Sequence, residues 1–522
     1  MGKRTTRAVM IIALMILSVL PFLPGIDAPF FYDDFNTIVT NPAIRSPDLV
    51  SYFTHPETFA ADRSRMFRPL TTASLALNYQ WFGGRIQGWH LTNLFAHILC
   101  VAMVFLVVDS LLGSTFLAFL TALWFGIHPS RVVPVVYISA RSEIFASFFY
   151  LLSFYLFLLM RRSAQKYAGI LAGILSLACF WLGLTCKDIA ITLPATLTLA
   201  VLVFQKPERK TLFWLALFWL SVPIYFLVRH RLNLYSFFPA ARPRPVFENL
   251  LLQARVVVYY IRWLFFPMHP SVEAQFSPLS TSVAALCAIL LAAVLAIGVF
   301  LVFKRRAAGF FICFFFIVLS PSSSLVPLVV EGSISRAYLA GLSCFVLFAW
   351  LLLQVDAQGR NRITAMILAA VISICLFVFS IDWAGDWKNP GRLWSRTVMV
   401  FPRHSPGHDN LGLWLERNGN FPQAEREYVL ALISDPENAT ALDNYGRMLY
   451  RKDEFELAEQ FFKKSLELKP WNCIARINYG QMLVSLGRVN EAREIVGAID
   501  FCPGYEQEFE ELKRRAGNSP TP

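Results

Sequence analysis

Two adjacent carboxylates, Asp33 and Asp34, follow the first long apolar run of the chain and lie between aromatic residues in the segment APFFYDDF. At the boundary of a bilayer, the low dielectric raises the pKa of at least one such carboxyl group toward the range that suits a general base. The pair is therefore the first candidate for proton transfer. The alternative interpretation is that both side chains end a helix and face water.

Basic side chains form a second candidate group. Many occur in segments that the predicted membrane topology places on the same side of the membrane as Asp33. They include Arg68, Arg131, Arg141, Lys187, Arg229, Arg244, Arg255, Arg262 and Arg336. Guanidinium groups bind phosphate through paired hydrogen bonds, so this concentration of cations predicts an anionic ligand at the outer membrane surface. The alternative is that these side chains extend to the lipid head groups.

Two classes of protein are disfavoured by what the sequence lacks. It has no Walker loop, GxGxxG, HExxH or GxSxG motif, which argues against nucleotide hydrolysis and the commoner hydrolase mechanisms. The net charge of +12 comes without a basic tract or a nucleic-acid-binding motif. Lysine and arginine in the cytoplasmic loops of a membrane protein account for this charge, so we expect no nucleic-acid partner.

The elements that must position these residues are transmembrane helices. The chain has 522 residues, of which 56% are hydrophobic and 16% charged, and this is too apolar for an ordinary soluble protein. Apolar stretches close to the length of a membrane-spanning helix recur from Ala8 to Trp383. The predicted spans are 8–25, 89–108, 114–128, 142–160, 167–185, 188–205, 211–228, 280–303, 309–327, 336–354 and 363–382.

The basic residues also predict the orientation of the chain. The start MGKRTTR indicates a cytoplasmic N-terminus followed by an uncleaved anchor, and each long inner loop then carries lysine or arginine, as the positive-inside rule requires. The segment 248–268 is apolar but contains Arg255 and Arg262, and counting it as a span would break this rule. We interpret it as re-entrant or interfacial, which gives about 11 crossings and an extracytoplasmic C-terminal domain; a full crossing is the alternative.

The C-terminal part repeats with a period of 34 residues. Gly412, Gly446 and Gly480 are spaced by this period, as are Ala424, Ala458 and Ala492. This spacing matches the tetratricopeptide repeat, in which small residues let two helices pack closely. We predict an all-α chain with a transmembrane domain at 1–388 (first extracytoplasmic loop 26–88), a linker at 389–404 and a repeat solenoid at 405–522. The repeats are expected at 405–438, 439–472 and 473–506, followed by a polar capping helix.

The two cysteines of the soluble part, Cys473 and Cys502, could pair in an oxidising compartment. Their spacing does not fit a metal site.

The order of the outer motifs resembles a known family. YDD, NPAIR, FRPLT, WHLTNLFAH, FGIHPSRVVPVVYISARSE, LTCKDIAITLPA and SRAYLAGLS, followed by C-terminal repeats, are similar to the transmembrane and tetratricopeptide-repeat-containing glycosyltransferases of the GT-C superfamily. The resemblance implies a polyprenyl-phosphate-sugar donor. Its eukaryotic members are protein O-mannosyltransferases of the endoplasmic reticulum with longer repeat arrays, so a compact bacterial relative is the expectation here.

The family's functional elements map onto individual residues of this chain. They fall at Asp33 and Asp34, at Arg141 and Glu143, at Lys187 and Asp188, and at Arg336 and Tyr338. The acidic residue of the third element, often Glu in the family, is Asp188 here and therefore one methylene shorter. Two histidines of the same outer motifs, His90 and His128, are further supporting candidates.

The resulting hypothesis is an inverting transfer of a sugar, such as a mannose-like hexose, from polyprenyl phosphate to a hydroxyl group. Asp34 or Asp33 would accept the proton or hold a divalent cation (Mg²⁺ or Mn²⁺), and Glu143 is the third catalytic candidate. The donor phosphate would be bound by Arg68, Arg141, Lys187 and Arg336.

The preferred acceptor is Ser or Thr of a protein recruited by the repeat groove, in the periplasm of a bacterium or, in a eukaryote, in the lumen of the endoplasmic reticulum. A glycan or lipid acceptor is a second possibility. The competing class is a non-catalytic scaffold, in which membrane helices, embedded among lipids, anchor repeats that assemble an envelope or secretion complex.

Overall fold

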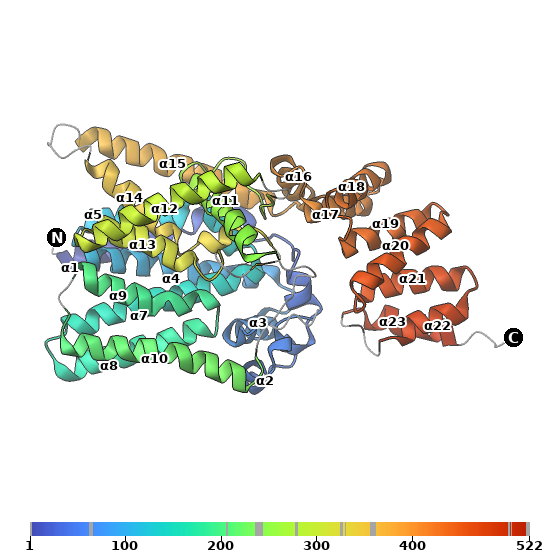
Figure 1. Ribbon diagram of the computed structural model, residues 1–522, viewed down its shortest axis with the longest axis horizontal. Coiled ribbons are helices and arrows are strands. Elements are labelled where there is room, and N and C mark those ends of the chain that lie inside the picture. Colours follow the sequence, from blue (N-terminus) through green and yellow to red (C-terminus); the bar gives the residue numbers. More distant parts are fainter. Residues whose placement is uncertain are drawn as a thin grey trace. The chain divides into compact units, whose positions relative to one another are not determined.

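The structure is a computed structural model that describes residues 3–61, 66–204, 207–234, 244–276, 280–323, 327–328, 330–354, 362–499, 502 and 504–517. The chain divides into two compact units. The membrane unit comprises Met1–Asp34, Ala43–Met268 and Pro278–Lys388, and the repeat unit comprises Phe35–Pro42, His269–Ser277 and Asn389–Pro522. The described residues form helices and no strand (Figure 1), which confirms the predicted all-α class.

The membrane unit consists mainly of α-helices, most of them long and apolar, in which the backbone satisfies its own hydrogen bonds as the bilayer interior requires. They are α1 (Lys3–Leu17), α2 (Leu49–Thr54), α3 (Pro69–Phe82), α4 (Ile86–Leu112), α5 (Thr115–Ile127), α6 (Val132–Val136), α7 (Arg141–Arg162), α8 (Lys166–Leu184), α9 (Leu193–Phe204), α10 (Arg209–Arg231), α11 (Val246–Phe265), α12 (Thr281–Phe303), α13 (Ala307–Leu319), α14 (Gly341–Gln354) and α15 (Arg362–Asp386). Short 3-10 helices include η1 (Leu20–Gly25), η6 (Ile138–Ala140), η7 (Asp188–Thr192) and η8 (Ile334–Ala337).

Seven helices of the described chain are long and apolar enough to cross a membrane. An eighth candidate is a pair, Thr115–Ile127 and Pro129–Val136, that is bent by 54°. Three further apolar helices are shorter: Asp188–Phe204, Ala307–Leu319 and Gly341–Gln354. Each of the 11 predicted spans falls on one of these helices, and the chain is a multi-pass membrane protein. The number of crossings and their direction stay predictions.

The segment predicted to be re-entrant or interfacial forms one continuous helix, α11, which is not among the candidate spans. Its buried face is partly polar, with Asn249, Gln253 and Tyr260 spaced at helical intervals. This face contacts the backbone before η8: Gln253 Nε2 donates to the Glu331 carbonyl over 3.2 Å, and the Ser333 N–H donates to Tyr260 Oη over 2.9 Å. α11 therefore supports the segment that leads to Arg336.

The predicted first outer loop, residues 26–88, contains the α-helices α2 and α3 besides shorter helical turns. α3 begins at Pro69, directly after Arg68, because proline fits the first turn of a helix, where its missing N–H needs no partner. α2 is capped by Asp48, whose carboxylate accepts from the N–H groups of Val50 and Ser51. These short helices fix the loop that lies between the candidate acidic pair and α4.

The C-terminal part of the repeat unit consists of successive helix pairs that follow the 34-residue period. They are α17 (Ser405–Arg417) with α18 (Phe421–Ser434), α19 (Ala439–Arg451) with α20 (Phe455–Leu468), and α21 (Cys473–Ser485) with α22 (Val489–Gly497), followed by α23 (Glu506–Gly517). Gly412 lies against the Tyr428 ring and Gly446 against the Phe462 ring, so the small residues do allow close packing. The arrangement is consistent with a tetratricopeptide solenoid.

Two other segments complete the C-terminal part of the repeat unit. The predicted linker 389–404 contains a helix, α16 (Pro390–Val400), whose Gly391 packs against Trp414 of the first repeat. Cys473 and Cys502 form a disulfide, with their Cα atoms 5.6 Å apart, so the pairing that the sequence left open is made. This bond ties the segment before α23 to the start of α21.

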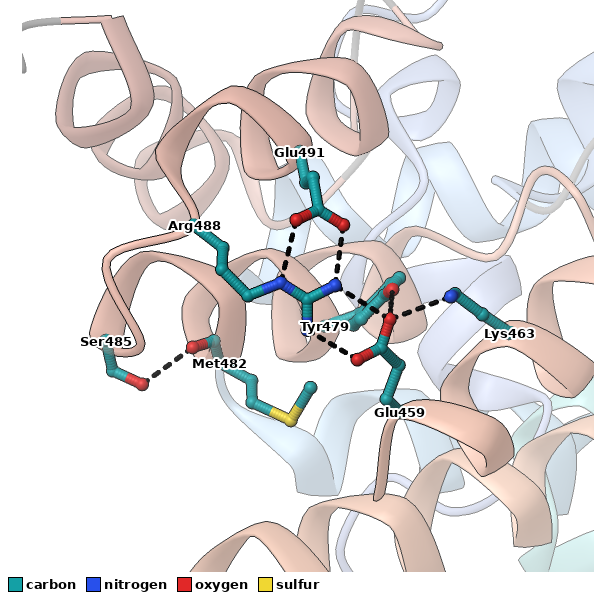
Figure 2. Close-up of polar contacts among 7 residues, drawn as sticks. All are labelled: Glu459, Lys463, Tyr479, Met482, Ser485, Arg488 and Glu491. Carbon is teal, nitrogen blue, oxygen red and sulfur yellow. Dashed lines mark hydrogen bonds and ion pairs between the residues drawn. The ribbon is translucent and has the colours of Figure 1, made fainter. Parts of the chain in front are cut away.

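Charged side chains join the second repeat to the third (Figure 2). Arg488, at the start of α22, pairs with Glu459 of α20 over 2.5 Å and with Glu491 over 2.6 Å. Glu459 also accepts from Tyr479 Oη over 2.9 Å and pairs with Lys463 over 2.7 Å. These donors, with Arg488 the strongest, lower the pKa of Glu459 to about 2.

Replacing Arg488 by methionine should therefore loosen the third repeat. Because Arg488 is partly exposed, we expect a loss of about 1 kcal/mol in the unfolding free energy of the repeat unit. Pulse proteolysis of the purified protein in urea, with detection of C-terminal fragments, measures this change. The matched control is Lys513→Met, which removes a surface pair with Glu510 within α23 and should cost less than about 0.5 kcal/mol. Equal effects of the two variants would contradict the role given to Arg488.

A second property of the repeats depends on pH. Burial raises the pKa of Asp409 to about 7 and that of Asp443 to about 6, although hydrogen bonds from Asn444 and Asn478 oppose the shift. Asp409 is also acted on by the charges of Asp443, Arg447 and Lys469. Because the unfolded pKa is near 3.8, the folded state binds more protons than the unfolded state between roughly pH 4 and pH 7.

The unfolding free energy of the repeat unit should therefore fall as the pH rises through this window. Asp409→Asn keeps an oxygen for Asn444 and removes the charge, so it should flatten the dependence and make the repeats more stable at pH 8. Pulse proteolysis at pH 5 and pH 8 tests this expectation. If the unfolding free energy of the wild-type repeat unit instead rises with pH, folding does not raise the pKa values of these two carboxylates.

Candidate functional site

The two adjacent aspartates have different surroundings. Asp34 is buried, whereas Asp33 is exposed. Asp34 Oδ1 accepts hydrogen bonds from the Ser139 N–H (2.8 Å) and the Ser139 hydroxyl, and Oδ2 accepts from the Phe31 N–H (3.0 Å). Burial raises the pKa of Asp34 to about 7 against the opposing effect of these bonds. Asp34 therefore fastens the loop to η6, and Asp33 is the carboxylate that reaches the surface.

Asp33 is held through its backbone by an aromatic group. Its N–H donates to Tyr137 Oη over 2.9 Å, and the Tyr137 ring stacks on Trp387 with centroids 5.7 Å apart. Phe31 packs edge-on against both rings. Tyr32, directly before Asp33, has φ +50, a left-handed conformation that is uncommon for a bulky residue and must be maintained by its surroundings. The backbone at Asp33 is thus fixed on both sides.

Glu143 and Lys187 form an ion pair between the first turn of α7 and the residue before η7. Glu143 is 2% exposed, and its Oε2 has no hydrogen-bond partner among the described residues. Arg68, directly before α3, donates to Ser142 Oγ over 3.3 Å and stacks over the Phe59 ring. Three segments that are distant in the sequence therefore meet at the start of α7.

Arg336 reaches this group from η8. Its guanidinium donates to the carbonyls of Val330 (2.9 Å) and Glu331 (3.3 Å), which orient the side chain while leaving it charged. The backbone that supplies these carbonyls is the segment supported by α11.

The electrostatic effects place these charges near one another. Burial lowers the pKa of Lys187, the charge of Glu143 raises it, and those of Arg68 and Arg336 lower it further. Burial also lowers the pKa of Arg68, against the charges of Asp188, Glu143 and Asp33. We call Arg68, Lys187 and Arg336, with Glu143 among them, the basic cluster. The cluster holds three cations and one carboxylate. Asp188, which also acts on Arg68, pairs with Arg229 over 3.1 Å, so positive charge remains in surplus and suits an anion such as a phosphate.

The sequence predicts that Arg141 binds the donor phosphate, but its guanidinium lies in a different environment from those of the basic cluster. It is completely buried, and its guanidinium donates to Asn93 Oδ1 (2.7 Å) and to the carbonyls of Ser74 (3.2 Å) and Trp89 (3.1 Å). These bonds connect the start of α7 to α3 and α4. The motif alone does not indicate that Arg141 faces inward while Glu143, two residues later, faces Lys187.

The four supporting candidates also make packing contacts. His90 Nε2 donates to the Ala28 carbonyl over 2.9 Å, and His128 Nε2 donates to the Leu264 carbonyl over 3.0 Å. Tyr338 Oη lies 2.7 Å from His97 Nδ1, and His97 Nε2 donates to the Gly126 carbonyl of α5 over 3.0 Å, so His97 connects α4 to α5 and to Tyr338. Asp188 accepts from Arg229 over 3.1 Å. All four hold elements of the membrane unit together.

Sequence reasoning missed Tyr137, Ser139 and Ser142. Tyr137 and Ser139 hold the two aspartates, and Ser142 accepts from Arg68. All three lie in YISARSE, the segment that supplied Arg141 and Glu143. Proximity to that motif was the available signal, but neutral hydroxyl groups do not stand out without the contacts that the fold creates.

A metal site is not evident in the part of the chain that the structure describes. No three His, Cys, Asp or Glu side chains are grouped there as a metal ion would need. The oxygens of Asp34 already accept hydrogen bonds from Ser139 and Phe31, and we derive no step through a cation.

No protein-family model matches the chain. It is 24% identical over 450 residues to a protein O-mannosyl-transferase of Caenorhabditis elegans, covering 82% of this chain and 63% of the relative. It is also 24% identical to protein O-mannosyl-transferase TMTC4 of Mus musculus, over 79% of this chain and 64% of the relative. With human TMTC3, the identity is 28% over 24% of this chain and 14% of the relative.

The chain thus spans less than two thirds of the length of the first two relatives. The matches nevertheless cover most of this chain and confirm the resemblance carried by its outer motifs. The chain is therefore a relative of the TMTC protein O-mannosyl-transferases.

Proposed function

We propose that this protein is a membrane glycosyltransferase that moves a sugar from a polyprenyl-phosphate donor to a hydroxyl group of an extracytoplasmic acceptor. The observation that carries the proposal is the basic cluster at the start of α7, with the exposed Asp33 carboxylate among the charges that act on Arg68, since a carboxylate base and a phosphate site are the two parts that such a transfer needs. The names of the relatives support a glycosyl transfer, with a sugar donor and a protein acceptor.

In the proposed reaction, the Asp33 carboxylate accepts the proton of the acceptor hydroxyl. The oxygen of that hydroxyl attacks the anomeric carbon of the sugar, and the bond from this carbon to the phosphate oxygen breaks. Polyprenyl phosphate leaves with the bonding electrons and inversion at the anomeric carbon. Arg68, Lys187 and Arg336 stabilise the charge on the departing phosphate, and Glu143 holds the Lys187 ammonium in place.

The lipid nature of the donor is supported by the setting of the site. The residues of the basic cluster lie beside apolar helices, and outside the cytosol nucleotide sugars are normally absent. The disulfide between Cys473 and Cys502 supports a repeat unit in an oxidising compartment, such as the periplasm or the lumen of the endoplasmic reticulum. We propose that the acceptor is Ser or Thr of a protein, bound by the repeats.

Incubation of the purified protein with a panel of polyprenyl-phosphate sugars tests the function directly. Mass spectrometry should detect free polyprenyl phosphate and a hexose added to a Ser- or Thr-containing peptide. Absence of both products with every donor would refute the transferase in favour of a scaffold. Transfer to a glycan or lipid alone would refute only the protein acceptor.

Asp33→Asn should abolish most turnover without affecting the fold, because it removes the base and keeps the backbone N–H that Tyr137 accepts. We expect kcat to fall by roughly 10²- to 10⁴-fold, with an unchanged thermal unfolding temperature. Asp34→Asn is the companion variant. It replaces an oxygen that accepts from Phe31 by an amino group, and should lower the unfolding temperature instead. A fully active Asp33→Asn enzyme would exclude Asp33 as the base.

Arg68→Met and Arg141→Met separate a phosphate ligand from a structural arginine. Arg68→Met should leave a folded protein whose KM for the donor rises about tenfold or more, because a charge-assisted contact to phosphate is lost. Arg141→Met removes the donor to Asn93 Oδ1 and the bonds to the Ser74 and Trp89 carbonyls that connect α7 to α3 and α4, and should reduce the yield of monodisperse protein. Size-exclusion chromatography and donor kinetics provide the two readouts. A well-folded Arg141→Met variant with a raised KM would reverse the assignment.

A further inference from the structure

The segment directly after the two aspartates belongs to the repeat unit. Phe35–Pro42 is grouped with the repeats, whereas Asp34 is the last residue of the preceding stretch of the membrane unit. Phe35–Val39 forms a single helical turn, which Thr40 closes by donating both its N–H and its Oγ1–H to the Phe35 carbonyl, each over 2.8 Å. The chain therefore passes from one unit to the other within two residues of Asp33.

Within the repeat unit, Thr40 lies directly against Gly504. Gly504 has φ +77, and a Cβ atom there would lie 2.2 Å from Thr40 Cγ2, 2.3 Å from Thr40 Cβ and 3.1 Å from Thr40 Cα. A side chain at position 504 would thus require the backbone at Thr40 to move. Only glycine satisfies both the close approach and the left-handed conformation.

The Gly504 side of this contact is firmly held. The Gly504 N–H donates to Glu506 Oε1 over 2.8 Å, at the start of α23. Two residues before Gly504, Cys502 is bonded to Cys473 at the start of α21. A disulfide and a helix start thus hold the backbone that contacts Thr40.

The repeat unit also includes a second segment from between the membrane helices. Residues 269–277 follow α11, and the Val272 N–H donates to Thr397 Oγ1 of α16 over 3.4 Å. Glu273 lies 3.7 Å from His404, and Phe276 packs edge-on against Phe401. The repeat unit therefore includes two segments, 35–42 and 269–277, that lie between membrane helices in the sequence.

We propose that the repeat unit is a positioning element of the catalytic site, in which the contact between Gly504 and Thr40 fixes the segment that follows Asp33. The inference rests on the proposed function and extends it. Tyr137 holds the backbone N–H of Asp33, and the segment Phe35–Pro42, which contacts Gly504 through Thr40, follows directly after Asp34. Consecutive Cα atoms are about 3.8 Å apart, so a shift at Phe35 reaches Asp33 with little attenuation, and displacement of a base by about 1 Å can cost 10²-fold in rate.

Positioning of Asp33 by the repeats and recruitment of an acceptor by the repeats predict different kinetic effects of a defect in the repeat unit. If the repeats only bound a protein acceptor, a defect in them would not affect a small acceptor. If they position Asp33, the same defect lowers kcat for every acceptor, while the KM for the donor stays unchanged because the basic cluster belongs to the membrane unit.

Gly504→Ala tests this in the full-length protein. The assay uses a blocked Ser-containing dipeptide as acceptor and the polyprenyl-phosphate sugar that the wild type turns over. We expect kcat to fall by roughly 10- to 100-fold, with the donor KM within about twofold. The matched control is Gly419→Ala, because Gly419 also has φ +77 but no atom lies within 4 Å of its added Cβ. It imposes the same backbone strain within the repeats and should keep kcat near the wild-type value.

Two more variants probe the contact from the Thr40 side. Thr40→Ala removes the hydroxyl and Cγ2 without adding strain at position 504, and it should also lower kcat. In Thr40→Gly combined with Gly504→Ala, the two closest clashing atoms are gone, so kcat should recover to that of Thr40→Gly alone. Equal kcat values for Gly504→Ala and Gly419→Ala, or a wild-type kcat for Thr40→Ala, would overturn the positioning role. An inactive wild type with every donor would instead overturn the proposed function itself, and the inference with it.

Discussion

The hydrogen bonds from Ser139 to the buried Asp34 carboxylate join the first outer loop to the turn that precedes α7. The rest of the candidate site depends on this junction, because α7 supplies Glu143 and with it the position of Lys187. A buried carboxylate is unfavourable unless its oxygens are satisfied, and here three donors satisfy them. These hydrogen bonds offset the cost of burying the carboxylate and fix the local geometry, with Asp34 inside and Asp33 at the surface.

At the start of α7, a charged side chain with a structural role lies next to one that belongs to the candidate site. Arg141 and Glu143 lie two residues apart on a helix and therefore point in different directions. Arg141 donates to α3 and α4, whereas Glu143 faces Lys187. A buried arginine with carbonyl partners stiffens the scaffold, whereas the cations of the basic cluster stay partly exposed.

The repeat unit carries its own electrostatic organisation. Asp409 and Asp443 bond to the asparagines one repeat further on, and Glu459 pairs with Arg488 across the next interface. Each bond crosses from one helix pair to its neighbour, as expected for a solenoid whose stability comes from interfaces between adjacent units. The disulfide adds a covalent constraint near the end of the chain, close to the contact between Gly504 and Thr40.

The sequence by itself determined the apolar helices, the helical character of the chain and the 34-residue period, because these depend on composition and spacing along one segment. It also indicated Asp33, Glu143 and Lys187 through their motifs. It did not distinguish Asp33 from Asp34 or Arg68 from Arg141, and it did not reveal Tyr137, Ser139 or the helical form of residues 248–265. Only the tertiary structure decided these points, because the burial and the partners of a polar side chain are set by residues distant in the sequence.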